Sequence, residues 1–73
     1  MEEQLLNIFR EVFNEADPAE ITLDTEFREL EQYSSLVQMT LIERIESELK
    51  VKLKLLPMVK AETIADVMDA IEQ

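Results

Sequence analysis

Apolar residues recur every three or four positions over three stretches of the chain, a spacing that places them on one face of an α-helix. Residues 2–16, residues 35–49 and the segment from about Thr63 onward follow this pattern, so we expect a main helix in each. The expected buried stripes are Leu5, Ile8, Phe9, Val12, Phe13 and Ala16 in the first helix, Leu36, Met39, Ile42, Ile45 and Leu49 in the second, and Ile64, Val67, Met68 and Ile71 in the last.

Local signals predict where these helices begin and end. Asp17-Pro18 ends the first helix, because proline disfavours helical geometry in the residue before it. Thr63-Ile64-Ala65-Asp66 matches a capping box at the start of the last helix. Ser35 and Gln38 match a second capping box at the start of the 35–49 helix, and Ser34 is an equally good cap.

The remaining segments complete the expected fold. Residues 17–34 have no sustained period and predict a long loop, which is unusual in a small domain and often functional. Residues 51–53 suggest a short extended exit and not a sheet, and Pro57 fits the first position of a brief third helix. The chain therefore predicts an all-α four-helix bundle with three main helices and one short one. The loop is expected to be pinned to the core by Ile21, Leu23, Phe27 and Leu30.

The length and composition predict a single domain over residues 1–73, because the chain is too short for two. Its apolar fraction of 47% is ordinary for a globular protein. No apolar run is long enough to span a membrane, and the acidic start MEEQLL is unlike a secretory signal. We therefore expect a complete cytoplasmic protein that is monomeric.

Two residue types that carry much of protein chemistry are absent from the chain. It has no cysteine and no histidine, which excludes disulfides and a cysteine nucleophile and argues against a zinc site. No segment has the spacing of a calcium loop, so no metal is expected. A small hydrolase using Ser35 is a poor alternative, because no histidine is present to take its proton. We expect a protein that is not an enzyme.

The formal net charge of −10 repels nucleic acid and anionic lipid, so neither is expected as a partner. Such a charge attracts partners with basic patches, or it simply keeps a small protein soluble. The charge is uneven, because residues 1–34 carry ten acidic and two basic residues while residues 35–73 carry seven and five. Four lysines make the later part locally basic: Lys50, Lys52, Lys54 and Lys60.

Ser35 admits three interpretations. Its local pattern fits a helix cap. The second interpretation is a catalytic nucleophile, which is a poor one because the chain has no histidine to take the proton. Ser35 is also a good substrate for a separate enzyme, because backbone amides and the dipole at a helix N-terminus favour an attached phosphate.

The stretch FRELEQYSSLVQMTLIERIESELKVKL resembles the centre of an acyl carrier protein. That family has a loop phenylalanine eight residues before a serine in an Asp-Ser-Leu motif that opens the second helix. Here Phe27 stands eight residues before Ser35, and Leu36 follows. The final TIADVMDAI resembles the family's last helix, so the resemblance covers nearly the whole chain.

The resemblance implies that Ser35 carries covalent 4′-phosphopantetheine, transferred from coenzyme A by a phosphopantetheinyl transferase. The arm's thiol would hold acyl groups as thioesters and present them to acyl-loading and acyl-processing enzymes. Leu36 would contact the transferase and later partners. The other positions where the family's second helix meets partner enzymes are Ser34, Val37, Met39, Thr40, Glu43, Glu46 and Ser47.

The chain departs from the family at several places. Ser34 replaces the usual aspartate, Gln32 replaces a usual glycine, and KLLPMVKAE replaces a normally acidic third helix. These changes favour a specialised carrier of a fatty-acid, polyketide or related lipid pathway over the housekeeping fatty-acid carrier. The alternatives are a carrier for aminoacyl groups and a carrier-like helical interaction module that is never modified.

Two apolar features leave their roles open in the sequence. Met39, Met58 and Met68 suit either an acyl tunnel or ordinary core filling, since methionine adapts its shape. The stretch of residues 55–59 suits either a docking patch or burial under the second helix.

Overall fold

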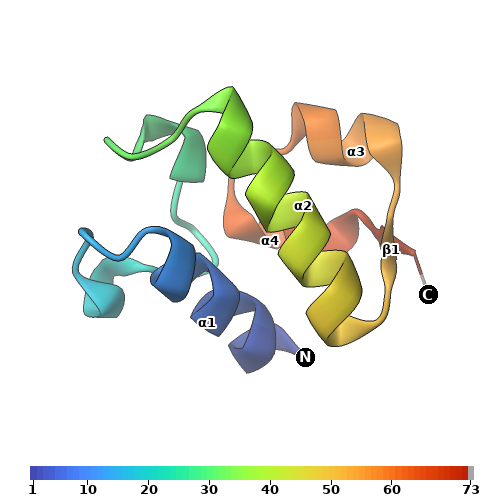
Figure 1. Ribbon diagram of the computed structural model, residues 1–73, viewed down its shortest axis with the longest axis horizontal. Coiled ribbons are helices and arrows are strands. Elements are labelled where there is room, and N and C mark those ends of the chain that lie inside the picture. The colour runs from blue at the N-terminus through green and yellow to red at the C-terminus, as the bar shows by residue number, and fades with distance from the viewer. Residues whose placement is uncertain (73) are drawn as a thin grey trace.

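The computed structural model describes residues 1–72, and within them the chain forms four α-helices (Figure 1). This confirms the predicted all-α four-helix bundle with a short third helix and a long loop between the first two helices, although the last helix, predicted as a main one, has only six residues, as many as the third. No helix among the described residues has the length and apolar character needed to cross a bilayer. The elements in chain order are α1 (Glu2–Val12), two short 3₁₀ turns (Pro18–Glu20 and Phe27–Glu29), α2 (Ser35–Leu49), β1 (Lys52–Leu53), α3 (Leu55–Lys60), α4 (Ile64–Asp69) and β2 (Ile71–Glu72).

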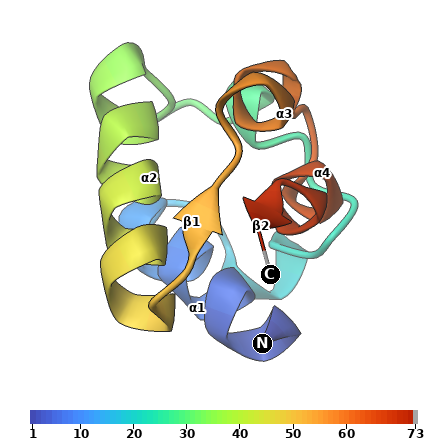
Figure 2. The same ribbon diagram turned by 90° about the vertical axis from the view of Figure 1, so that its right-hand side faces the viewer.

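The core lies between α1, α2 and α4, with α3 packed beside α4 at one end (Figures 1 and 2). An aromatic cluster occupies its centre. Phe9 of α1 meets Phe27 of the loop edge to face, with ring centroids 5.3 Å apart, and Phe13 stacks beyond Phe9. All three rings are fully buried, as is Ile21, so the long loop is anchored in the core as predicted. The loop is thereby held to the core at two points, Ile21 and Phe27.

The first helix is shorter than predicted, because α1 ends at Val12 and residues 13–15 form a turn. Phe13 leaves the helix yet remains buried, and Ala16 is half-buried outside it. Arg10 donates to the backbone carbonyls of Pro18 and Ile21 at 3.2 Å each, which holds the returning chain against the end of α1. The early end of the helix thus brings Ile21 back into the core.

The buried face of α2 differs in part from the predicted stripe. Leu41 and Ile45 are fully buried, and Ile42 and Leu49 are half-buried as expected of stripe residues. Leu36 and Met39 are wrongly placed by the prediction, because 72% and 66% of their surfaces are exposed. Both apolar faces of α2 have helical spacing, and packing against α1 selects one of them.

Two further predictions near the C-terminus are wrong. Lys52 pairs with Glu72 and Leu53 with Ile71 in an antiparallel two-stranded ladder (Figure 2), where the sequence predicted no sheet. Ile71 therefore lies in β2 and not on the last helix, although it is buried. The pairing joins segments far apart in sequence, so no local pattern announces it.

Two predictions remain for the places where helices begin: Pro57 for α3 and the Thr63 capping box for α4. Pro57 is the third residue of α3 and not its first, a position that is tolerated because amides of a first helical turn have no intrahelical acceptor. The capping box at Thr63 is confirmed: its hydroxyl accepts from the Asp66 amide at 3.2 Å, and the Asp66 carboxylate accepts from the Thr63 amide at 3.1 Å.

Candidate functional site

The two serines at the start of α2 have different roles. Ser34 is the helix cap: its backbone is extended, and its hydroxyl accepts from the Val37 amide at 3.1 Å. The capping box predicted for Ser35 and Gln38 is therefore wrong, and the alternative cap, Ser34, is the one used. Ser35 is the first residue of α2 and is exposed, and its hydroxyl makes no hydrogen bond to any of residues 1–72. That hydroxyl is open to reaction.

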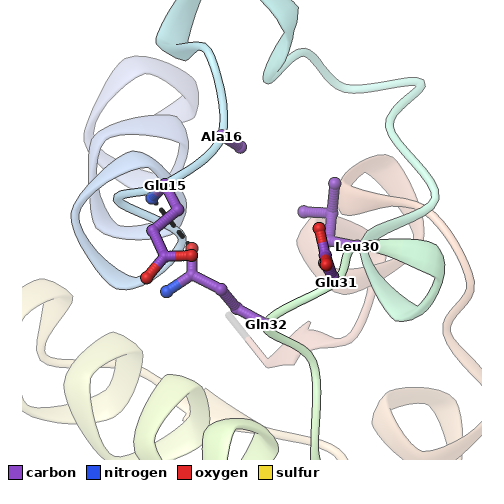
Figure 3. A pocket seen from close by; sticks show the side chains of 5 residues that line it. All are labelled: Glu15, Ala16, Leu30, Glu31 and Gln32. Carbon is purple, nitrogen blue, oxygen red and sulfur yellow. Dashed lines mark hydrogen bonds between the residues drawn. The ribbon is translucent and has the colours of Figure 1, made fainter.

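Gln32 joins the loop before Ser35 to the turn that follows α1. Its side-chain oxygen accepts from the Glu15 amide at 2.9 Å, and its side-chain nitrogen donates to Asn14 Oδ1 at 3.2 Å. Figure 3 shows Gln32 reaching across to Glu15 at the edge of a shallow pocket that Leu30 also lines. Gln32, which stands where the family usually has glycine, thus fixes the position of the loop that leads to Ser35.

Arg28 fastens the same loop to α3. Its guanidinium donates to the carbonyls of Ala61 at 2.6 Å and Val59 at 2.7 Å, which belong to the C-terminal end of α3 and the residue after it. It also donates to the Tyr33 hydroxyl at 3.1 Å and lies over the Phe27 and Tyr33 rings. Because a helix C-terminus carries partial negative charge, this cation stabilises the junction.

A pocket opens beside Ser35, between the loop and α2. Arg28 and Tyr33 line it from the loop, and Ser35, Gln38, Met39 and Ile42 line it from α2. None of its lining residues is acidic, although the chain has 17 acidic residues. The lining of the pocket therefore carries one positive charge, from Arg28, and no negative charge.

Among residues 1–72, two ionisable groups have clearly shifted pKa values, and both form hydrogen bonds within the fold. The amides of Glu62 and Thr63 donate to the Asp66 carboxylate, which lowers its pKa. Hydrogen bonds to Glu48 and Glu11 raise the pKa of Arg44, which links α2 to α1. Neither group lines the pocket beside Ser35.

The predicted partner-contact residues are divided between two environments. Val37 and Glu46 are half-buried, and the Glu46 carboxylate accepts from the Leu53 amide at 2.9 Å. Two of the predicted contact residues in α2 donate their hydroxyls to backbone carbonyls, Thr40 to Leu36 at 3.1 Å and Ser47 to Arg44 at 3.5 Å. The exposed members follow Ser34 along one outward face of α2: Leu36, Met39, Thr40, Glu43 and Ser47.

The three methionines differ from one another in burial, and so do the residues of the 55–59 stretch. Met58 is buried in the core, Met68 is half-buried, and Met39 is exposed, so the described residues form no shared methionine-lined tunnel. In α3 the residues around Met58 point outward, and Leu55 is 73% exposed. Each of the two interpretations of residues 55–59 therefore holds for part of the stretch.

Sequence reasoning did not identify Arg28, Tyr33 and Gln38 as neighbours of the serine. Gln38 lies one turn after Ser35 and was considered only as a cap partner. Arg28 directly follows the loop phenylalanine, but its place beside Ser35 depends on how the loop folds back. No local spacing signals that contact.

Comparison with known proteins gave one finding. A family model described as a phosphopantetheine attachment site matches residues 3–71, nearly the full length of the chain. Comparisons with curated proteins and with solved structures gave no significant match.

Proposed function

This chain belongs to the phosphopantetheine-binding carrier family, which includes the acyl carrier proteins, and from that premise we propose that it tethers acyl intermediates on an arm attached to Ser35. Its cofactor is 4′-phosphopantetheine, and its partners in general terms are a phosphopantetheinyl transferase and acyl-processing enzymes. Carrier domains of this family are non-catalytic.

The observation that carries the proposal is the free hydroxyl of Ser35. It is exposed in the first turn of α2, and Ser34 already satisfies the capping requirement. Helix N-terminal amides and the helix dipole favour a phosphate at this position. The residues present therefore fit the group: the serine can be esterified without removing a hydrogen bond from the fold.

The bound cofactor supplies a thiol that holds acyl groups as thioesters, which this cysteine-free chain cannot supply itself. Ser35 contributes the nucleophilic oxygen in the attachment step. Its oxygen forms a bond to phosphorus as the pyrophosphate bond of coenzyme A breaks, and adenosine bisphosphate leaves. The Ser35 proton passes to a base of the transferase, because the chain offers no histidine for that task.

The outward face of α2 is the proposed contact surface for these enzymes. Leu36, Met39 and Glu43 give it exposed apolar groups beside a carboxylate, next to the attachment point. Apolar anchors with charged neighbours are typical of protein interfaces. The surface comprises Ser34, Leu36, Met39, Thr40, Glu43 and Ser47, with Val37 and Glu46 at its edges.

The proposed pathway is specialised fatty-acid, polyketide or related lipid synthesis, with the protein acting as a monomer. Support comes from α3, where the exposed Leu55 is preceded by Lys54 and the helix ends at Lys60. A partner that recognises an acidic third helix would not be complementary to this surface. The carrier is therefore expected to serve its own set of enzymes.

A modification assay tests the proposal. We expect a broad-specificity phosphopantetheinyl transferase with coenzyme A to add the mass of one arm to the wild-type protein and none to Ser35→Ala. Ser34→Ala is the matched control, because it removes the neighbouring hydroxyl: the reaction run to completion should still add one arm, even where the loss of a contact residue slows it. An unmodified wild type, or a modified Ser35→Ala, would contradict the proposal.

A second candidate function is an interaction module that is never modified. Ser34 in place of the family's usual aspartate favours it. Intact-mass measurement of the protein purified from its native host distinguishes the two: the carrier has the mass of one arm added, and the module has the mass of the bare chain.

A further inference from the structure

The pocket beside Ser35 presents hydrogen-bond donors that the fold leaves unused. Arg28 has five N–H groups. Four of them donate to the carbonyls of Ala61, Met58 and Val59 and to the Tyr33 hydroxyl. One N–H on Nη1 has no acceptor among residues 1–72. Arg28 lines the pocket, so it contributes a cation with one N–H that the fold does not use.

Gln38 supplies a second set of free donors on the opposite wall. The Tyr33 hydroxyl donates to Gln38 Oε1, which fixes the orientation of the amide. The Gln38 side-chain nitrogen then has no acceptor within the described chain. Arg28, Tyr33 and Gln38 thus form a chain of hydrogen bonds with donors free at both ends, which suits an acceptor-rich ligand.

The charge of the pocket restricts that ligand further. Arg28 makes no ion pair among residues 1–72, whereas Arg10 and Arg44 each pair with glutamate. The Arg28 guanidinium is only partly exposed, so a nearby anion is less screened by water than at an open surface. A cation with a free donor favours an anionic oxygen, and phosphate geometry matches guanidinium well.

The wall of the pocket formed by α2 also has apolar surface. Met39 is 66% exposed and Ile42 is half-buried, and both line the pocket with Ser35. They lie one and two turns after Ser35 along the helix, so the apolar surface begins beside the serine and continues away from it. A ligand attached at Ser35 would meet the donors and this apolar surface together.

We propose that this pocket is a docking site for the proximal part of the phosphopantetheine arm, which rests on the proposed attachment at Ser35. Arg28 and Gln38 donate to the phosphate oxygens, and Met39 and Ile42 pack against the two geminal methyl groups of the pantoyl unit. The attachment makes docking intramolecular, so weak contacts suffice to hold it. The arm then leaves Ser35 along the side of α2 that lines the pocket with Arg28 and Tyr33 of the loop.

Nuclear magnetic resonance of the apo and modified proteins tests this proposal. We expect nuclear Overhauser contacts between the geminal methyls of the arm and the methyl groups of Met39 and Ile42. The Arg28 Nε–H and Gln38 side-chain amide signals should shift on modification. Gln38→Glu replaces the free donors by a carboxylate beside the phosphate and still accepts from Tyr33. In modified Gln38→Glu, the contacts with Met39 and Ile42 should be lost.

Gln4→Glu is the matched control, because it makes the same chemical change at an exposed position of α1 away from the pocket. The modified Gln4→Glu protein should retain the contacts between the arm and Met39 and Ile42. Intact mass distinguishes a failure of the proposed attachment at Ser35 from a failure of the docking site. A protein that gains no arm overturns both the proposed function and the docking site. A protein that gains the arm but has no methyl contacts in the wild type, or retains them fully in Gln38→Glu, overturns the docking site alone.

Discussion

Two adjacent serines with the same side chain perform different tasks because their backbones differ. The extended backbone of Ser34 turns its hydroxyl back toward the Val37 amide, whereas Ser35 already has helical geometry. The Ser35 hydroxyl makes no hydrogen bond among residues 1–72 and the residue is exposed, so its oxygen remains in contact with solvent. This division leaves one hydroxyl free for modification without weakening the start of α2.

Asp66 gives a prediction at the scale of one residue. Amides of Glu62 and Thr63 donate to its carboxylate and lower its pKa below the ordinary 3.8. The ionised form of Asp66 is therefore favoured in the folded state. This stabilisation is fully present above about pH 3.8, and it is lost as the pH falls through the lower pKa of the folded state. We expect Asp66→Asn to be less stable than wild type near neutral pH, with the difference shrinking below about pH 4.

Urea unfolding from neutral pH to about pH 3 measures this difference. Asp69→Asn is the matched control, because it removes a charge from the same helix but makes no side-chain hydrogen bond among residues 1–72. A wild-type advantage over Asp66→Asn that stays constant down to the lowest pH would show that the ionised carboxylate does not stabilise α4.

At the scale of the element, α2 carries apolar residues on two faces. Leu41 and Ile45 contact the core, while Leu36 and Met39 lie on the outside. Helical spacing groups residues by face but does not indicate which face meets a neighbour. Exposed apolar residues are common on protein surfaces and cost little in folding, and these two remain available to a partner.

The cap of α2 gives the element-scale prediction. We expect Ser34→Ala to lower the free energy of unfolding by about 1 kcal/mol, because the Val37 amide loses its acceptor. Ser34→Asp should remain within a few tenths of a kcal/mol of wild type, since aspartate caps equally well. Chemical denaturation followed by circular dichroism measures both.

Ser47→Ala serves as the control for that experiment, because Ser47 is exposed within the same helix and alanine favours helix there. Ser34→Ala and Ser47→Ala with equal effects on stability would rule out a specific capping role for Ser34.

At the scale of the whole molecule, electrostatic repulsion acts across the entire fold. The net charge is −10, and the principal dimensions are 30 × 22 × 19 Å. The Debye length falls from about 30 Å at 0.01 M salt to about 10 Å at 0.1 M. At the lower salt concentration most charges therefore interact with one another, and at the higher concentration only neighbours do.

Salt should therefore stabilise the protein. Added sodium chloride also weakens the three ion pairs of Arg10 and Arg44, but exposed pairs contribute only about 0–1 kcal/mol each. We expect the reduced repulsion to dominate and to raise Tm by roughly 4–8 °C, the equivalent of about 1 kcal/mol in a domain of this size. Thermal unfolding at the two salt concentrations measures the shift.

A double variant, Glu29→Gln with Glu31→Gln, provides the control. It changes the formal net charge from −10 by two units, to −8, at exposed positions outside the ion pairs. Its Tm should rise less with salt than that of the wild type. A Tm that falls with salt would mean that local ion pairs outweigh the overall repulsion.

The sequence alone predicted the features that depend on neighbours along the chain. Helical periodicity gave the main helices, the Thr63 and Asp66 pair gave the start of α4, and Phe27 was correctly expected to enter the core. The register from Phe27 to Ser35 led to the family that the comparison then matched. These signals are local because helix propensity and capping act within one or two turns.

Tertiary structure alone decided which chain segments meet. The β1–β2 ladder, the exposed side of α2, and the approach of Arg28 to both Ser35 and the end of α3 all join residues distant in sequence. The sequence determined that a serine would begin a helix in an acidic bundle. Packing determined that this serine would be free, and that a cation and unused donors would lie beside it, because contacts between distant segments form only when the core closes.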